Sequence, residues 1–358
     1  MTRLLLLYRP RLPGLRAQSV QVTHMAHALA ARGHRVTLLA DRGAGATTPA
    51  AALGALGLSP LPALDLQLCP HAHKGLAGWW FRRRLAAWWG GPPGLVLARD
   101  LSRLAAAVAR HGRRHRIVVE AHGLDSLLDA EAGRDPAAAR AREAAAMGVA
   151  HALVTNCGGT LAAWRASGHA LPPVQGAIHN GTAARPVSVD DSGELRCVGS
   201  LRAYKGVAAI RAAAPRLPLP LVWIGGTDAE RAATPPTAHL ALRPPVPHPQ
   251  VAATLAGARA VLVPLADNPF GRQLTSPLKL WDALAVGRPI VAPDLPTIDE
   301  IAALAGRSMH RYRPGDPDSL VGAVRSAAVA APPPPFVRSW GDRAADLDAV
   351  FARLPEPG

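Results

Sequence analysis

The most constraining feature of the sequence is a repeated alternation of short apolar runs with longer amphipathic segments. In the first half the apolar runs lie at residues 3–8, 35–40, 94–100, 116–123, 151–156 and 174–181. After a polar, proline-containing stretch the alternation starts again, with runs at 194–200, 221–226, 260–266 and 289–293. Short apolar runs between helical segments of about 10–15 residues predict βαβ units and parallel sheets.

The length and the restart together predict two domains. A chain of 358 residues is too long for one ordinary core. We therefore expect an α/β protein with two doubly wound, Rossmann-like parallel-sheet domains facing a cleft, at residues 1–184 and 185–335. The stretch TAARPVSVDDSG (182–193) serves as the linker, and the proline run at 331–336 precedes a last segment, 336–358, whose helix packs back on the N-terminal domain.

The net charge of +15 is unevenly distributed. Residues 1–186 hold 22 Lys and Arg against nine Asp and Glu, whereas residues 187–358 hold 18 against 16. Such asymmetry is compatible with a nucleic acid, an anionic membrane surface or an acidic ligand, and equally with a general preference for arginine in this chain. Hydrophobic residues at 49% and charged residues at 18% indicate a globular chain rather than a disordered one.

Cysteine usage and the N-terminus bear on the compartment. Three cysteines without a pairing pattern indicate a reducing cytoplasm and no zinc site. The apolar run Leu4–Tyr8 is too short for a signal peptide or a membrane span, so we expect it to form the first strand.

Lysine is scarce, and two of the three lysines lie at expected strand-to-helix junctions. In TSPLKLWDALAVG (275–287), Ser276 is expected to cap a helix that Pro277 begins and Gly287 ends. Lys279 would then lie in the first turn, where the helix dipole disfavours a cation by roughly 0.3–1 kcal/mol. Either Lys279 and Asp282 form a surface pair, or Lys279 and the free N–H groups of that turn bind an anion while Asp282 accepts hydrogen bonds from sugar hydroxyls.

The second junction is CVGSLRAYKGV (197–207), with Lys205 at the entrance of the helix. Glycines at such a turn let a phosphate approach the backbone. The stretch matches neither the P-loop pattern nor a regular G-x-G-x-x-G, so those nucleotide-binding motifs are disfavoured.

Several stretches in order resemble one family across essentially the whole chain. GSLRAYKG (199–206), LVWIGG (221–226) and TSPLKLWDALAVGRPIVAPDLPTIDEI (275–301) resemble the donor-binding domain of retaining family 4 glycosyltransferases, which have the GT-B fold. In the N-terminal half GHRVTLLA (33–40), VVEAHG (118–123) and AIHNG (177–181) stand where the family has its typical strand ends.

The resemblance implies roles for individual residues. Lys205 matches the lysine that binds the diphosphate of the nucleotide-sugar, Asp282 matches the acid that holds the ribose, and His122 matches the histidine beside the reacting sugar. Gly14 and Ser19 lie in the first strand–helix loop, which in the family faces the diphosphate or the acceptor. The further positions implied for the diphosphate are Lys279, Ser200, Arg202 and Ser276, and Gly225 is implied for the nucleotide.

The sequence departs from the family pattern at two positions. Ser200 stands where many members have an arginine, for which Arg202 is the nearest substitute. Leu274 stands where the first acid of a pair is usual, so backbone groups of 271–276 would replace that acid. The variant SPLK, with Lys279, resembles a subset of the family that also lacks this acid.

The resemblance implies retention of configuration, and the chemistry of the leaving group favours a mechanism without a metal. The leaving nucleoside diphosphate is a polyanion, so preplaced donors supply most of the stabilisation that its departure needs. Lys205, Lys279 and helix N-termini would provide it, and no cofactor is expected beyond the nucleotide-sugar as co-substrate. The pair Asp316 and Asp318 is interpreted as a loop and helix start, and no carboxylate nucleophile is proposed.

The segment GWWFRRRLAAWWGG (78–91) holds half of the eight tryptophans. As a helix it would gather Phe81, Leu85, Trp88 and Trp89 on one side. Such a segment suits the surface of an anionic membrane, with Trp79, Trp80, Arg82, Arg83, Arg84, Trp88 and Trp89 as contacts. The alternatives are a helix docked on the N-terminal sheet and a wall of the acceptor site.

The sequence therefore predicts a cytoplasmic glycosyltransferase, peripheral on the inner membrane face if residues 78–91 contact lipid. The acceptor, held by the basic N-terminal domain, is a lipid-linked sugar, a glycan or a small molecule. Another GT-B enzyme (a sugar epimerase or a phosphorylase), a nucleic-acid-binding protein and a catalytically silent scaffold are the alternatives. No nucleic acid is expected, because basic and aromatic residues form no identifiable nucleic-acid module.

Overall fold

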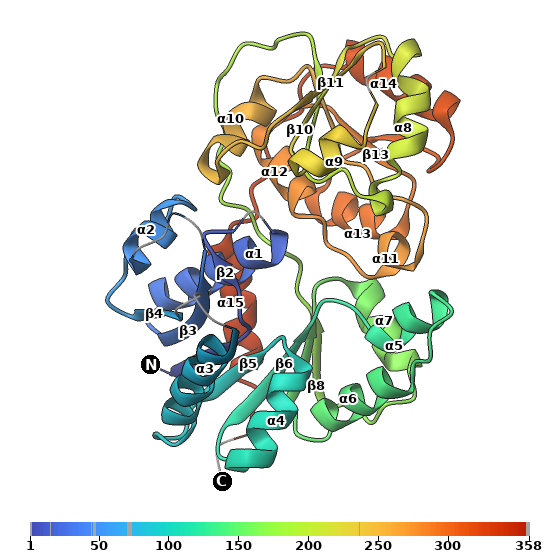
Figure 1. Cartoon of the computed structure of the whole chain (residues 1–358). Helices are drawn as coiled ribbons and strands as arrows, with labels where there is room; N and C mark the ends of the chain where they lie inside the picture. The colour runs from blue at the N-terminus through green and yellow to red at the C-terminus, as the bar shows by residue number, and fades with distance from the viewer. Residues whose placement is uncertain are drawn as a thin grey trace. The chain divides into compact units, whose positions relative to one another are not determined.

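The computed structural model describes residues 2–14, 16–43, 45, 48–69, 74–235 and 237–355. They form two compact α/β units, shown in Figure 1. Unit 1 comprises Met1–His179 and Trp340–Gly358, and unit 2 comprises Asn180–Ser339. The polar stretch 182–193, expected as a linker, therefore belongs to unit 2. There the Thr182 amide donates to the carbonyl of Arg338.

Unit 1 is built on a parallel sheet in the order β2-β3-β1-β5-β6-β7-β8, with β4 pairing with β3. The strands of unit 1 are β1 (Arg3–Leu7), β2 (Arg11–Leu12), β3 (Arg35–Arg42), β4 (Leu64–Cys69), β5 (Leu95–Ala98), β6 (Arg116–Ala121), β7 (Ala152–Thr155) and β8 (Val174–Ala177). Its helices are α1 (Ala17–Ala31), α2 (Pro49–Gly54), α3 (Lys74–Trp89), α4 (Leu101–His111), α5 (Asp125–Glu131), α6 (Ala137–Met147), α7 (Gly158–Ala166) and α15 (Trp340–Phe351).

Unit 2 is built on a parallel sheet in the order β11-β10-β9-β12-β13-β14. Its strands are β9 (Leu195–Val198), β10 (Leu221–Ile224), β11 (Leu240–Arg243), β12 (Ala260–Leu262), β13 (Ile290–Pro293) and β14 (His310–Tyr312). Its helices are α8 (Val207–Ala213), α9 (Asp228–Ala232), α10 (Val251–Ala256), α11 (Pro269–Gln273), α12 (Leu278–Val286), α13 (Pro296–Ala305) and α14 (Pro317–Val329), with short 3-10 turns at Ala203–Lys205, Ala214–Arg216 and His248–Gln250. Numbered from β9, this strand order is 3-2-1-4-5-6, the Rossmann order.

Each sheet has a point where the strand order reverses. In unit 1 it lies between β1 and β5, and in unit 2 between β9 and β12. Ligands of open α/β sheets bind outside the carboxyl ends of the strands at such a point. The segments that matter most for binding are therefore those that follow β1 and β5, and those that follow β9 and β12.

The last helix returns to unit 1. The helix α15 lies beside α1, as Figure 1 shows in red and blue. Trp340 stacks on His24 with ring centroids 5.7 Å apart. Asp348 accepts hydrogen bonds from Arg32 and, over 2.7 Å, from Nε2 of His34. Residues 331–339 instead stay with unit 2, where the Phe336 amide donates to the carbonyl of Leu284.

The aromatic helix α3 corrects part of the membrane interpretation. Phe81, Leu85, Trp88 and Trp89 are buried and pack in the core of unit 1, so the predicted apolar side of the helix faces the sheet. Trp88 and Trp89 were expected as membrane contacts, and for these two residues the interpretation is wrong. Nε1 of Trp89 donates to the carbonyl of Gly112. The exposed side carries Trp79, at 48% exposure, and Arg82, Arg83 and Arg84.

Among the described residues, no helix is long and apolar enough to cross a membrane. None of the three cysteines forms a disulfide, and all three are buried.

The two sides of α3 make the fold testable. Trp89→Ala removes a fully buried ring and is expected to lower the free energy of unfolding by about 3–5 kcal/mol. Trp79→Ala, on the exposed side of the same helix, is expected to change it by less than about 0.5 kcal/mol. Urea unfolding of both variants provides the measurement. Equal losses in the two variants would contradict the assignment of the buried side.

Candidate functional site

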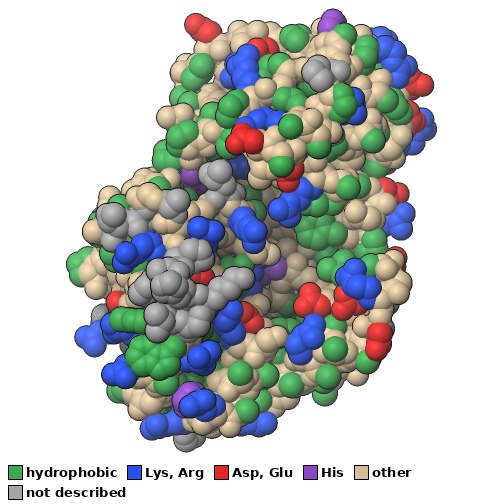
Figure 2. Space-filling view, viewed as in Figure 1, with side chains coloured by type: hydrophobic (Ala, Val, Ile, Leu, Met, Phe, Trp, Pro, Cys, Tyr) green, Lys and Arg blue, Asp and Glu red, His purple; other side chains and the backbone are tan. Residues whose placement is uncertain are grey.

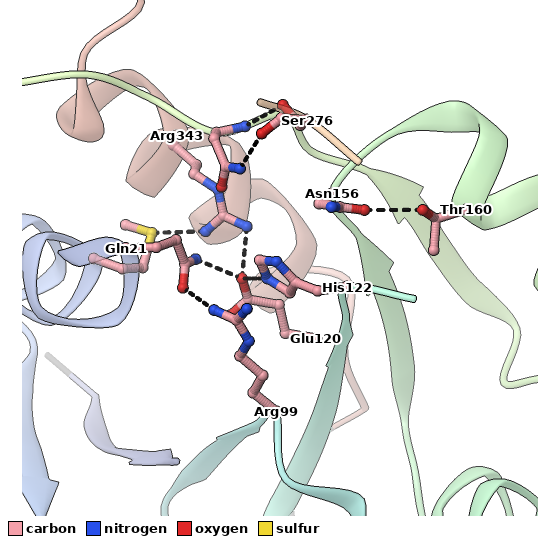
Figure 3. A network of polar contacts seen from close by, with 10 residues as sticks. Gln21, Arg99, Glu120, His122, Asn156, Thr160, Ser276 and Arg343 are labelled. Carbon is pink, nitrogen blue, oxygen red and sulfur yellow. Dashed lines mark hydrogen bonds and ion pairs between the residues drawn. The ribbon is translucent and has the colours of Figure 1, made fainter. Parts of the chain in front are cut away.

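The candidate site of unit 1 is centred on one buried carboxylate. Glu120 is the penultimate residue of β6, it is only 3% exposed, and its Oε1 accepts three hydrogen bonds. The donors are Nε2 of Gln21 on α1 at 2.8 Å, Nε2 of His122 at 2.6 Å and Nη2 of Arg343 on α15 at 2.7 Å. Figure 3 shows these side chains converging from separate elements.

The charges around Glu120 keep it ionised. Burial alone would raise the pKa of Glu120, but Arg343, His122 and Arg99 outweigh burial and hold the pKa well below its usual value. Arg343 is completely buried, and Glu120 is its carboxylate partner. Removing one partner of a buried ion pair leaves an uncompensated charge, so the two residues depend on one another.

His122 is held as a neutral ring. Because the Glu120 carboxylate can only accept, Nε2 of His122 must carry the proton, and Nδ1 is then an acceptor. Burial lowers the pKa of His122 to about 4, and the charge of Arg99 adds to the effect. A neutral imidazole with a bare Nδ1 can accept a hydrogen bond from a hydroxyl, although with this pKa it is a weak base.

Arg99 follows β5 directly, and the sequence analysis did not predict it as a site residue. Its Nη1 donates to Oε1 of Gln21, and its guanidinium lies 5.2 Å from the ring centre of Tyr8, which follows β1. The amide of Gln21 therefore bridges Arg99 and Glu120. Arg99 and Tyr8 both lie at the point where the strand order of unit 1 reverses.

The first loop brings its two expected residues together. A Cβ on Gly14 would lie 2.4 Å from the carbonyl of Arg11 and 3.3 Å from Oγ of Ser19, so only glycine fits there. Ser19 is buried in the first turn of α1. The hydroxyl of Tyr8 donates to Oε1 of Gln18 on the same helix over 2.6 Å.

The candidate site of unit 2 starts at the carboxyl end of β9. Gly199 has a φ of +148°, and a Cβ there would lie 3.2 Å from Nζ of Lys205, which folds back over this glycine. A Cβ on Gly225, at the end of β10, would lie 2.4 Å from the carbonyl of Gly199. Glycine is thus required where the two strand ends meet and where the lysine lies.

No ion pair offsets the charge of Lys205 among the described residues. Within the part of the chain that the structure describes, its ammonium has no carboxylate partner, and its nearest ring is that of Tyr204 at 6.0 Å. The Tyr204 carbonyl accepts from the Ala266 amide over 2.7 Å. The loops after β9 and β12, which flank the reversal point of this sheet, are therefore joined beside Lys205.

The other expected residues of this loop have local partners. Oγ of Ser200 lies 3.2 Å from the hydroxyl of Tyr204. Arg202 is exposed, and its Nε donates to Oε1 of Glu230 over 3.4 Å. Glu230 closes a capping box with Thr227 at the start of α9 and also accepts from the Leu201 amide. The spacing T-x-x-E at 227–230 is typical of a capping box, but it does not indicate the contacts of Glu230 with Arg202 and Leu201.

Lys279 and Asp282 do form a pair, but it is not a surface pair. Nζ of Lys279 donates to Oδ2 of Asp282 over 2.9 Å, and the hydroxyl of Thr182 donates to Oδ1. Asp282 is only 7% exposed. Burial would raise its pKa, but Lys279 and Thr182 outweigh this and lower the pKa. Both carboxylate oxygens are therefore occupied within unit 2.

Ser276 does not cap the helix, so that expectation is wrong. The helix α12 begins at Leu278 with Pro277 as its N-cap residue and ends at Gly287, as predicted for the glycine. Oγ of Ser276 instead accepts from Nε1 of Trp281 at 2.9 Å, and its carbonyl accepts from Nδ2 of Asn180 at 2.8 Å. The buried ring of Trp281 uses the hydroxyl that a cap would need.

Two further expectations concern acids. Leu274 is fully buried, so its side chain belongs to the core. Asp316 caps α14 by accepting from the Ser319 amide, and Asp318 pairs with Arg216, as expected for a loop and helix start. Among the described residues, no three His, Cys, Asp or Glu side chains are grouped in a way that could hold a metal ion.

Comparison with known proteins identifies the family. The family model described as "Glycosyl transferase 4-like domain" matches residues 16–181, and the one described as "Glycosyl transferases group 1" matches residues 193–328. The chain is a GT-B glycosyltransferase. A search of curated proteins finds no significant sequence match.

Solved structures share this fold at low identity. A sucrose-phosphate synthase from Thermosynechococcus elongatus matches with a TM-score of 0.71 and 17% identity, over 98% of this chain and 95% of that one. The Anabaena protein HepE, in complex with UDP-glucose, matches with a TM-score of 0.66 and 13% identity, over 99% and 96%. WaaG, a glycosyltransferase involved in lipopolysaccharide biosynthesis, matches with a TM-score of 0.59 and 14% identity, over 99% and 95%.

The pKa of His122 makes stability depend on pH. An unfolded chain has a histidine pKa of about 6.5, whereas the folded protein lowers it to about 4. The stability that comes from keeping this ring neutral is complete above about pH 6.5 and is lost as the pH falls toward 4, about 3 kcal/mol in all. Urea unfolding at pH 7 and pH 4.5 should therefore show a smaller acid-induced loss in His122→Gln than in the wild type. Equal losses would contradict the neutral ring.

Proposed function

We propose that the enzyme transfers a sugar from a nucleotide-sugar bound by unit 2 to an acceptor bound by unit 1, with retention of configuration and without a metal ion. The observation that carries the proposal is Lys205, whose ammonium lies over Gly199 at the reversal point of the unit 2 sheet. A cation without a carboxylate partner, beside a glycine backbone, suits a diphosphate. HepE, of the same fold, has been solved with UDP-glucose, which supports a nucleotide-sugar as donor.

The proposed mechanism assigns the leaving group to Lys205. A departing nucleoside diphosphate gains negative charge, and a preplaced ammonium stabilises that charge more in the transition state than in the ground state. Arg202 and Ser200 are assigned to the same diphosphate, and Gly225 lets the nucleotide approach the backbone. No metal ion is included because Lys205 provides the cation.

We propose that retention is achieved without a covalent intermediate, and the state of Glu120 supports the absence of such an intermediate. This carboxylate lies at the strand ends of unit 1, but it is buried and its Oε1 is occupied by three donors. It is a poor nucleophile in that condition. We assign His122 to the transferred sugar, as an acceptor at Nδ1 for a sugar hydroxyl, and the loop of Gly14 and Ser19 to the diphosphate or the acceptor.

Donor binding can be measured by calorimetric titration of UDP, GDP, ADP and dTDP. Lys205→Ala removes a charged donor and is expected to weaken the preferred nucleoside diphosphate by about 10- to 100-fold. Arg216→Ala is the matched control, because Arg216 ends the same βα segment away from the glycine loop and pairs with Asp318. An unchanged affinity in Lys205→Ala would contradict the proposed donor site.

The same titration tests Lys279 and Asp282. Lys279→Ala alone would strand a buried carboxylate, so its effect on affinity would be mixed with instability. The double variant Lys279→Met/Asp282→Asn removes both charges together. If Lys279 binds the diphosphate and Asp282 the ribose, the double variant should bind the nucleotide about 10-fold or more weakly. Wild-type affinity in the double variant would assign the pair to the fold alone.

We also propose that the exposed side of α3 contacts an anionic membrane surface from the cytoplasm. Trp79 and Trp80 are stacked by Arg83 and Arg84, with guanidinium carbons 5.4 and 4.4 Å from the ring centres. Aromatic rings and arginines together suit an anionic lipid interface. Trp79→Ser/Trp80→Ser should reduce sedimentation with anionic vesicles at low salt without lowering the unfolding midpoint. Equal sedimentation with anionic and neutral vesicles would contradict this proposal.

A further inference from the structure

The network around Glu120 contains more positive than negative charge. Arg99 and Arg343 are cations, Glu120 is the carboxylate they face, and His122 is neutral at pH 7. Arg343 forms an ion pair with Oε1 of Glu120, whereas Arg99 donates its hydrogen bond to the neutral amide of Gln21. Within the described residues, no carboxylate lies at ion-pair distance from Arg99.

Gln21 links Arg99 to Glu120. It donates to Glu120 through Nε2 and accepts from Arg99 through Oε1, so the hydrogen bond of Arg99 goes to a neutral amide and not to the carboxylate. In Figure 3 dashed lines join this amide to both residues. Arg99 and Arg343 share the single negative charge of Glu120, so one positive charge of this partly buried network is not offset. Two other arginines of unit 1 near the strand ends do have carboxylate partners: Arg9 pairs with Asp41, and Arg103 pairs with Asp100.

The place of Arg99 is where a ligand is expected. It follows β5, and the ring that it covers, Tyr8, follows β1. These are the two strands between which the order of the sheet reverses, and ligands of such sheets bind at their carboxyl ends. Arg99 is also partly exposed, so a ligand can reach it. Figure 2 shows many Lys and Arg side chains over the visible face of unit 1, which would attract an anion.

We propose that the acceptor carries an anionic group, a phosphate or a carboxylate, and that Arg99 binds this group at the carboxyl ends of β1 and β5. The inference rests on the proposed function, since it takes unit 1 as the acceptor domain. The anion supplies the negative charge that Glu120 cannot give to both arginines. A guanidinium is suited to this because it can present two parallel N–H donors to a phosphate or carboxylate.

The bound anion also changes His122. The charge of Arg99 is one cause of the low pKa of this ring, after burial. An anion beside Arg99 offsets that charge and makes the imidazole a stronger base. An acidic acceptor thus strengthens the hydrogen bond that Nδ1 of His122 accepts from a sugar hydroxyl, and a neutral acceptor of the same shape does not.

The probe is inorganic sulfate, which keeps its charge through the acid range, and the readout is the NMR signal of the His122 ring in the full-length protein. In the wild type, sulfate should move this signal and raise the pKa of His122 above about 4. In Arg99→Gln the pKa should already be raised without sulfate, and sulfate should bind about 10- to 100-fold more weakly. Arg103→Gln removes an equal charge that Asp100 already neutralises, and should behave as the wild type.

A wild-type His122 signal that sulfate leaves unmoved would overturn the proposal, whether or not the variants fold. Arg99→Lys keeps a cation at the site and should retain a response to sulfate that Arg99→Gln loses. An equal response in the wild type and Arg99→Gln would also overturn the proposal.

Two further titrations distinguish the source of the anion. If the preferred nucleoside diphosphate moves the His122 signal as sulfate does and blocks sulfate, the anion belongs to the donor and the acceptor assignment is wrong. If it binds through Lys205, is lost in Lys205→Ala and leaves the sulfate response intact, the acceptor assignment is supported. A sulfate response in a protein that binds no nucleoside diphosphate would support the anion site and contradict the donor site.

Discussion

The hydrogen bonds that Oε1 of Glu120 accepts connect separate elements of unit 1 to its central sheet. A buried carboxylate is costly unless it is paired and hydrogen-bonded. Its cation, Arg343, comes from α15, and 160 residues of unit 2 separate that helix from the rest of unit 1. The need to pair Glu120 is thus one physical reason why the chain returns to unit 1 at its end. The same oxygen fixes the ring of His122, so the last helix takes part in positioning a residue of the candidate site.

The two units use one architecture for different chemistry. In unit 2 Gly199 follows β9 at the reversal point, Gly225 follows the neighbouring β10, and the ammonium of Lys205 lies over Gly199. In unit 1 the corresponding positions carry Tyr8 and Arg99, and the nearby polar groups are an amide, a carboxylate and a neutral imidazole. A glycine backbone admits a diphosphate closely, whereas side chains that project from the strand ends leave room for a smaller group and set its charge. The sheet determines where binding takes place, and a few residues after each strand determine what is bound.

The sequence predicted the interior of both sheets and missed parts of their edges. Runs such as RLLLLY and AVLVPLA are buried on both faces and read as continuous apolar segments. The strands β4, β11 and β14 each pair on one side within the described sheets, and their polar residues obscure the pattern. The helical period of α3 correctly gathered Phe81, Leu85, Trp88 and Trp89 on one side. It could not show which side faces the sheet, because tryptophan and arginine suit a core and its rim as well as a membrane surface.

The candidate site was predictable where its signal is local. His122 and Lys205 stand in motifs at strand ends. Arg99, Gln21 and Arg343 had no such signal, since each gains its meaning from a partner more than 75 residues away. Lys205 and Lys279 looked equivalent, each at the start of a helix and each a rare lysine. The structure separates them by one contact: Lys279 is committed to the buried Asp282, whereas Lys205 has no carboxylate among the described residues. The carboxylate of Asp282 offsets the charge of Lys279, so of the two lysines Lys205 exerts the stronger attraction on a polyanionic leaving group.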